Sequence, residues 1–140
     1  MANHLEKLVG EWYEYNGYFV KKNVNVGRRE KGGYIGELDI VAFSPELNHI
    51  VHIEPSLDAN TWATREERFS KKFSAGLEYI PKLFIGLDIP DEIEQIALFY
   101  VGSNKNHKTI GGGRVMIVSE LFEQIIKEIS PKKLSSNVYT

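Results

Sequence analysis

Two acidic residues stand inside two neighbouring apolar stretches of this chain. Asp39 lies within residues 36–43 (GELDIVAF), and Glu54 lies within residues 49–56 (HIVHIEPS). A charge inside a buried strand is costly unless it is paired or binds a metal. Carboxylate oxygens are the ligands that Mg²⁺, Mn²⁺ and Ca²⁺ prefer. The pair therefore predicts a site for one divalent cation, and salt bridges to Arg or Lys are the structural alternative.

The spacing of these residues predicts that both carboxylates face the same side. Side chains alternate between the two faces of a strand. On the second stretch this puts Glu54 with His52 and Ser56, and on the first it puts Asp39 with Glu37 and Val41, opposite Leu38, Ile40 and Ala42. If residues 44–48 form a hairpin turn, Asp39 and Glu54 share a face. A magnesium ion held there would activate water and stabilise a phosphoryl group, which is the chemistry of phosphodiester cleavage.

Other catalytic centres fit the sequence less well. A zinc site of His49 and His52 with Glu54 is rejected because a spacing of three on a strand puts the imidazoles on opposite faces. His52 is expected either to support Glu54 or to pack as a core histidine. The chain has no cysteine and no Gly-x-Ser-x-Gly elbow, which argues against those hydrolase classes. The glycine run 111–113 precedes Arg114, lacks Gly-Lys-Ser/Thr and predicts a hairpin turn rather than a phosphate loop.

Basic side chains gather in three regions and could contact the phosphates of a nucleic acid. Net charge is −2, which excludes a uniformly basic surface but not a basic rim around acidic ligands. Each basic residue taken alone is best explained as solvated surface charge. As a set near an acidic pair, these residues favour nucleic-acid binding. The candidates for nucleic-acid binding are Arg28, Arg29, Arg65, Arg68, Lys105, Lys108 and Arg114.

The elements that would position these residues follow from periodicity. Helices are predicted over residues 4–15, from near Thr61 or Thr64 along a Phe69–Phe73–Leu77 stripe with Ile80 next, and after Ser119 as N-cap. Thr64 to Glu67 has the form of a capping box, and Pro81 predicts a break or a kink. Strands are predicted at 18–26, at the two acidic stretches, at 94–101 and at 114–118, with a glycine-rich turn at 27–36. This order predicts a mixed α/β sheet flanked by helices.

Length and composition limit the number of domains and the class of protein. The 140 residues, with 42% hydrophobic and 26% charged, predict a single globular domain over 1–140, with a frayed tail at 131–140. No apolar run approaches the ~18 residues of a membrane span, and no signal peptide is evident. A cytoplasmic protein is therefore expected.

At the two acidic stretches the chain resembles the PD-(D/E)XK nuclease superfamily, the restriction-endonuclease-like fold. Residues 36–42 (GELDIVA) resemble its glycine-(Glu)-x-Asp-apolar strand, and residues 50–56 (IVHIEPS) resemble the following strand up to the glutamate. The resemblance spans roughly residues 4–118 in element order and implies an αβββαβ core. It also implies that Asp39 and Glu54 bind Mg²⁺ or Mn²⁺ and that a first-helix glutamate assists, with Glu6 preferred over Glu11 and Glu14.

The chain departs from this pattern at Ser56, where the superfamily has a lysine. We therefore expect the positive charge to come from the following helix, through Lys71 or Lys72; the other readings are loss of cleavage and slow cleavage by the metals alone. The candidate catalytic set is Asp39, Glu54, Glu6, Lys71, Lys72 and Ser56.

Two functions are expected. The first is a metal-dependent endonuclease that hydrolyses DNA, which would need to form a homodimer to cut both strands. The alternative is a catalytically inactive nuclease-fold module that binds nucleic acid or a partner protein. An unrelated α/β binding domain with structural carboxylates is more distant.

Overall fold

The computed structural model describes residues 2–56, 60–100 and 107–127. Its elements, in chain order, are α1 (Ala2–Tyr15), β1 (Phe19–Arg28), β2 (Tyr34–Ser44), β3 (His49–Ser56), α2 (Trp62–Leu83), β4 (Ile93–Phe99), β5 (Thr109–Ile110) and β6 (Gly113–Ile117). A final helical segment covers residues 118–127. The tail predicted at 131–140 lies outside the described residues. None of the helices in the described ranges is long and apolar enough to span a membrane.

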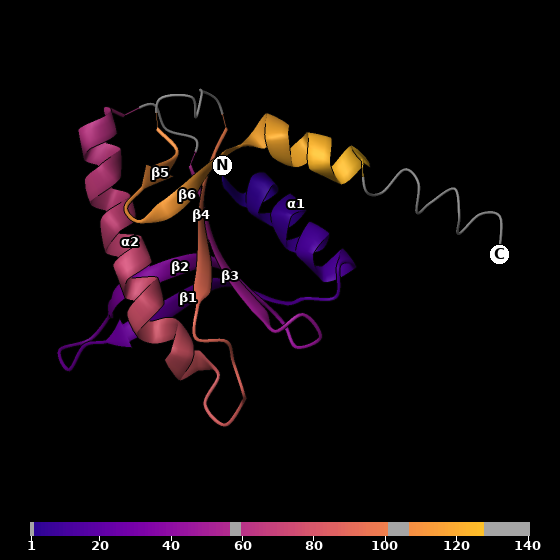
Figure 1. Ribbon diagram of the computed structural model, residues 1–140. Helices are drawn as coiled ribbons and strands as arrows, with labels where there is room; N and C mark the ends of the chain where they lie inside the picture. Colours follow the sequence, from indigo (N-terminus) through magenta and orange to yellow (C-terminus); the bar gives the residue numbers. More distant parts are fainter. Residues whose placement is uncertain (1, 57–59, 101–106, 128–140) are drawn as a thin grey trace.

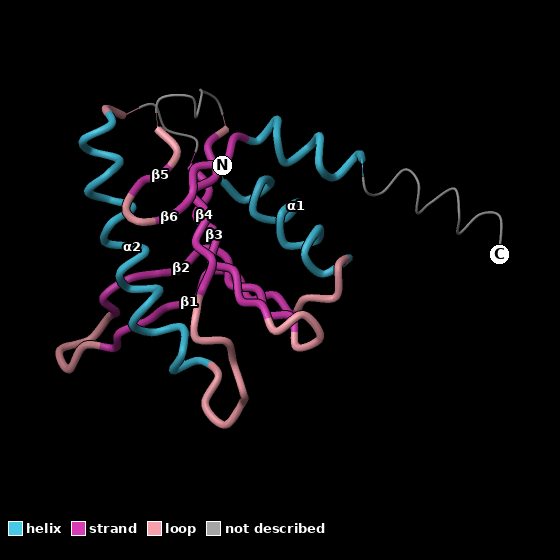
Figure 2. The backbone as a smooth tube through the Cα atoms, viewed as in Figure 1, coloured by secondary structure: helices cyan, strands magenta, loops and turns pink. Residues whose placement is uncertain are grey.

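The strands form one mixed six-stranded sheet in the order β1-β2-β3-β4-β6-β5. The first three strands pair antiparallel, as expected for two consecutive hairpins. β3 and β4 then pair in parallel, and α2 provides the crossover between them. Figure 1 shows α2 on one face of the sheet, with α1 and the final helix on the other. Figure 2 shows the strands running between these two helical layers. The predicted α/β class with a mixed sheet flanked by helices is confirmed.

α1 covers its face of the sheet through one apolar stripe. Leu5, Val9 and Trp12 recur at helical spacing and are buried. They pack against the side chains of β2, β3 and β4 that point the same way, among them Ile40 and Ile53. Each such side chain contributes about 1.5–3 kcal/mol of hydrophobic free energy on burial. The first helix is thus fixed beside β2 and β3, the two strands that carry the acidic residues.

α2 covers the other face with a stripe that the sequence predicts only in part. Phe69, Phe73 and Ile80 are buried as expected, but Leu77 is 55% exposed, and the helix turns Gly76 toward the sheet instead. Thr61 is the N-cap, since its hydroxyl accepts the amide proton of Thr64, so the cap predicted at Thr64 is wrong.

The end of α2 and the start of the final helix also differ from the sequence prediction. Pro81 lies within the last turn of α2, where the helix continues to Leu83. The final helix begins at residue 118, so Ser119 is not its N-cap. The carboxylate of Glu120 instead accepts the amide proton of Ile117 at 2.9 Å. This contact is the half of a capping box in which a carboxylate of the first turn accepts the amide proton of the residue before the helix.

The regular alternation of side chains breaks at Asp39. Ile40 belongs to the cluster under α1, yet Leu38 belongs to the cluster under α2. The prediction that Leu38 and Ile40 share a face is therefore wrong. Asn23, in the part of β1 beside Asp39, has a φ of 55°, and the pairing of β1 with β2 skips this position. Both strands change face at the same point, and Asp39 lies at the break.

Candidate functional site

The site forms where β2 separates from β3. The β2–β3 ladder ends at the pair Ile40 with Ile53. One residue further on, the amide of Asp39 donates to Glu54 Oε2 at 2.9 Å rather than to a backbone carbonyl. Glu54 is thus inserted at the point of divergence, and its side chain is only 2% exposed. The predicted hairpin geometry brings Asp39 and Glu54 together, although the strict alternation used to predict it does not hold.

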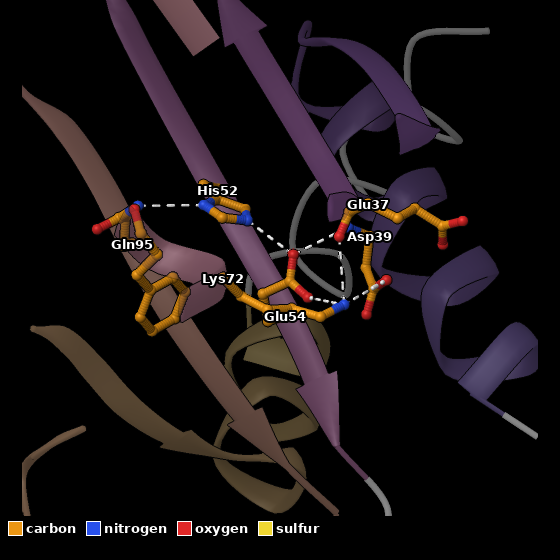
Figure 3. Close-up of polar contacts among 7 residues, drawn as sticks. Glu37, Asp39, His52, Glu54, Lys72 and Gln95 are labelled. Carbon is orange, nitrogen blue, oxygen red and sulfur yellow. Dashed lines mark hydrogen bonds and ion pairs between the residues drawn. The ribbon is translucent and has the colours of Figure 1, made fainter. Parts of the chain in front are cut away.

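Lys72 of α2 reaches both carboxylates. Its Nζ lies 3.0 Å from Glu54 Oε1 and 3.5 Å from Asp39 Oδ1. The same ammonium group donates to the backbone carbonyl of Glu37 at 3.2 Å. Figure 3 shows these three oxygens around Nζ, with the Glu37 carboxylate turned away. A single cationic group therefore occupies a pocket of oxygens contributed by two strands.

Neighbouring groups perturb the charges of all three residues. Burial and the charge of Glu54 raise the pKa of Asp39 from 3.8 to about 7. Burial would also raise the pKa of Glu54, but the hydrogen bond from His52, the charge of Lys72 and the amide of Asp39 outweigh it, so that pKa is lowered. Burial would lower the pKa of Lys72, and the two carboxylates outweigh it and raise that pKa. Between about pH 5 and pH 7 the site thus holds one Glu54–Lys72 ion pair and a protonated Asp39.

A chain of hydrogen bonds from Gln95 through His52 holds the carboxylate of Glu54. His52 Nε2 lies 2.7 Å from Glu54 Oε2, and His52 Nδ1 lies 3.1 Å from the amide nitrogen of Gln95. That amide also donates to the carbonyl of Phe73 at 2.8 Å. The sequence predicts that His52 either supports Glu54 or packs in the core. It does both, because it contacts Glu54 and is completely buried. Gln95 is missed by sequence reasoning; its one signal is an amide in an otherwise apolar strand.

The other candidate catalytic residues lie at different distances from Asp39, Glu54 and Lys72. Glu6 of α1 is buried, and burial followed by the charges of Glu37 and Glu54 raises its pKa, which puts it in the field of the site. Glu11 and Glu14 are exposed further along α1. Ser56 ends β3 half-buried.

Of the two candidate lysines, only Lys72 reaches the carboxylates. Lys71 is exposed and pairs with Glu67 along the helix at 3.6 Å. A groove of about 600 Å³ opens beside Lys72, between residues 35–38 of β2 and the side of α2 that carries Arg68, Lys71 and Tyr79. Lys72 lines this groove, whereas Asp39 and Glu54 do not, so the ammonium group lies between the groove and the two carboxylates.

The predicted nucleic-acid contacts are dispersed. Arg28 and Arg29 are exposed at the β1–β2 turn, and Lys108 is exposed before β5. Arg65 and Arg68 lie on α2, where they contact the rings of Phe99 and Phe69. Arg114 lies on the opposite face of the sheet from Lys72 and pairs with Glu94 at 3.3 Å. Lys105 lies outside the described residues.

The carboxylate oxygens fit a hard divalent cation. Glu54 Oε1 is buried, and its partner among the described residues is the ammonium group of Lys72, in an ion pair at 3.0 Å. Together with Asp39 Oδ1 and the Glu37 carbonyl it already surrounds a positive charge. Within those ranges no group of three or more His, Cys, Asp or Glu side chains is arranged to hold a metal, so only two side chains and a carbonyl are on offer. Such a sparse oxygen set suits an ion that keeps several water ligands, as Mg²⁺ does.

Comparison with family models, curated proteins and solved structures finds no match for this chain.

Proposed function

We propose that this protein is a divalent-metal-dependent endonuclease that hydrolyses DNA phosphodiester bonds, with a restriction-endonuclease-like core of the PD-(D/E)XK type. The observation that carries the proposal is the contact of Lys72 Nζ with both Asp39 and Glu54. The motif lacks its lysine at Ser56, and a lysine from the next helix reaches the same carboxylates. An isolated structural salt bridge would require only one carboxylate, whereas here two acids and a carbonyl converge on one cation.

The element order supports the proposed core. A helix, three antiparallel strands, a crossover helix and a parallel fourth strand follow one another from α1 to β4. The carboxylates lie on the second and third strands, and Glu6 lies on the first helix. This is the arrangement that the sequence resemblance implies.

Each residue has a distinct role in the proposed site. Asp39 and Glu54 would hold Mg²⁺ or Mn²⁺, which when bound supplies an activated water and positive charge at the phosphate. Lys72 Nζ lies among these same oxygens in the metal-free protein, so it would have to move aside when the ion binds. From beside the ion it would supply the positive charge that Ser56 cannot, and Glu6 would add negative charge at the α1 side. The groove beside Lys72 leaves room for the substrate strand.

A plasmid-cleavage assay with Mg²⁺ or Mn²⁺ tests this proposal. Asp39→Asn and Glu54→Gln should each abolish cleavage, and Lys72→Met should reduce its rate by about 100-fold or more, the usual range for a positioned acid–base or charge-stabilising group. Lys71→Met is the matched control, because Lys71 also lines the groove but pairs with Glu67 instead of the two carboxylates. It should lower the rate far less than Lys72→Met does.

Two results would overturn the proposal. Cleavage that survives both carboxylate substitutions would belong to another site or to a contaminant. DNA binding without cleavage, indifferent to metal and to these substitutions, would favour the inactive binding module instead.

A further inference from the structure

The two carboxylate oxygens of Glu54 have different surroundings. Oε2 receives two donors, the amide of Asp39 at 2.9 Å and the ring of His52 at 2.7 Å. Oε1 meets only the ammonium group of Lys72, at 3.0 Å, among the residues that the structure describes. The oxygen that already has two donors is poorly able to coordinate a cation as well. Glu54 therefore presents one oxygen to the cation position, not two.

The hydrogen bonds of Gln95 determine which ring nitrogen of His52 carries the proton. His52 and Gln95 are partners in the β3–β4 ladder. Because the Phe73 carbonyl can only accept, the Gln95 group that contacts it is the amide nitrogen. The same nitrogen faces His52 Nδ1, which must then accept. The ring proton is left on Nε2, where it points at Glu54 Oε2.

Packing holds the ring in this orientation. The Phe73 ring meets His52 edge to face, with centroids 5.3 Å apart. α2 approaches the ring at Gly76, where an added Cβ would lie 2.6 Å from His52 Cε1 and 2.9 Å from Gln95 Nε2. The imidazole is completely buried between helix and sheet. It has no room to rotate away from Glu54 while the helix is docked.

We propose that His52, held by Gln95 and by the close approach of Gly76, is a positioning residue that limits Glu54 to one coordinating oxygen and so sets a preference for Mg²⁺ or Mn²⁺ over Ca²⁺. This inference rests on the proposed metal-dependent function. Ca²⁺ takes six to eight oxygens and often binds a carboxylate through both, whereas Mg²⁺ takes six and keeps several waters. A site with one oxygen from Glu54, one from Asp39 and one carbonyl meets the second requirement.

Competition for bound Mn²⁺ tests the role without measuring activity. Mn²⁺ affinity is measured by electron paramagnetic resonance at one pH, and Mg²⁺ and Ca²⁺ are titrated in as competitors. Wild type should release Mn²⁺ at lower Mg²⁺ than Ca²⁺. In His52→Leu, Oε2 loses its ring donor, so Mn²⁺ affinity should fall about 10–100-fold. The Ca²⁺ to Mg²⁺ preference should also move several-fold toward Ca²⁺.

Two variants separate positioning from a loss of packing. His52→Gln keeps an amide donor at about the reach of Nε2, so it should retain the wild-type Ca²⁺ to Mg²⁺ ratio. His49→Gln removes the other histidine of β3, which bonds Tyr18 and Glu94 at the opposite end, and should leave both affinity and ratio unchanged. If circular dichroism shows that His52→Leu is unfolded, Gln95→Met is used, because it removes the donor that fixes the ring proton; the expected shift has the same direction.

The outcomes distinguish this inference from the proposed function. An unchanged Mn²⁺ affinity and ion ratio in folded His52→Leu or Gln95→Met would overturn the positioning role alone. So would an equal change of ratio in His52→Leu and His52→Gln. Wild-type protein that binds no Mn²⁺, or binds it equally after Asp39→Asn and Glu54→Gln, would overturn both proposals.

Discussion

The raised pKa of Asp39 predicts how stability depends on pH, and the test needs neither metal nor substrate. Burial first, and then the charge of Glu54, raise this pKa from 3.8 to about 7. A shift of about three units corresponds to about 4 kcal/mol of folding free energy, at 1.36 kcal/mol per unit. Asp39 is 14% exposed, so solvent screening reduces this value only modestly.

The sign follows from which state holds the proton. Between pH 4 and pH 7 the folded chain keeps the Asp39 proton, whereas the unfolded chain has lost it. The contribution of Asp39 is present in full below about pH 4, declines as pH rises, and is lost above about pH 7. Glu54 acts oppositely, since its pKa is lowered: its contribution is present above the ordinary pKa of 4.5 and is lost as the pH falls further. Measurements from pH 5 upward therefore leave Glu54 out, and comparison with an Asp39 variant separates Asp39 from Glu6, whose pKa is also raised.

Urea denaturation of wild type and Asp39→Asn, in chelator and at steps from pH 5 to pH 8.5, makes the comparison. Asparagine has no proton to lose, so the wild-type free energy of unfolding should fall relative to the variant by about 1.4 kcal/mol per pH unit up to pH 7 and then level off. Asp88→Asn, at an exposed position after α2, is the control and should track wild type. Parallel curves for wild type and Asp39→Asn would refute the assignment of a raised pKa to Asp39.

Two further predictions concern the elements that hold the site. Gly76→Ala should lower the free energy of unfolding by about 1–3 kcal/mol, because the added methyl group meets His52 and Gln95, whereas Ser74→Ala on the exposed side of the same helix should be nearly neutral; equal urea midpoints for both would contradict the close approach. Thr61→Ala should cost about 1 kcal/mol by removing the acceptor for the Thr64 amide, while Thr64→Ala should not, and thermal unfolding that ranks them the other way would show that the helix is capped elsewhere.

The sequence predicts the parts of this fold that depend on local periodicity. The α1 stripe of Leu5, Val9 and Trp12 and the apolar strands around Asp39 and Glu54 are confirmed, because burying one face imposes a repeat that is visible without the partner. The short turn between the two apolar strands brings Asp39 and Glu54 together, although the alternation of side chains breaks at Asp39 itself. Both acids were conspicuous because charge is rare in such strands.

Other features depend on how elements dock, which no local pattern encodes. Lys71 and Lys72 flank the same stripe, and only the rotation of α2 against the sheet decides that Lys72 reaches the carboxylates. That rotation follows from Gly76, the small residue that lets the helix approach His52. The change of face at Asp39 needs the left-handed Asn23 on the neighbouring strand, a coupling between residues 16 positions apart.

Beyond the last backbone pair of β2 and β3, the Asp39 amide donates to the side chain of Glu54. This hydrogen bond takes the place of the backbone contact that the two strands no longer make. Removing the carboxylate would therefore break the last link between β2 and β3, inside the sheet, as well as remove the charge of the site. Glu54→Ala would then combine a folding defect with a catalytic one. Glutamine keeps a carbonyl oxygen for that amide and discards only the charge. In this protein the choice of substitution, more than the choice of assay, determines whether architecture and chemistry can be told apart.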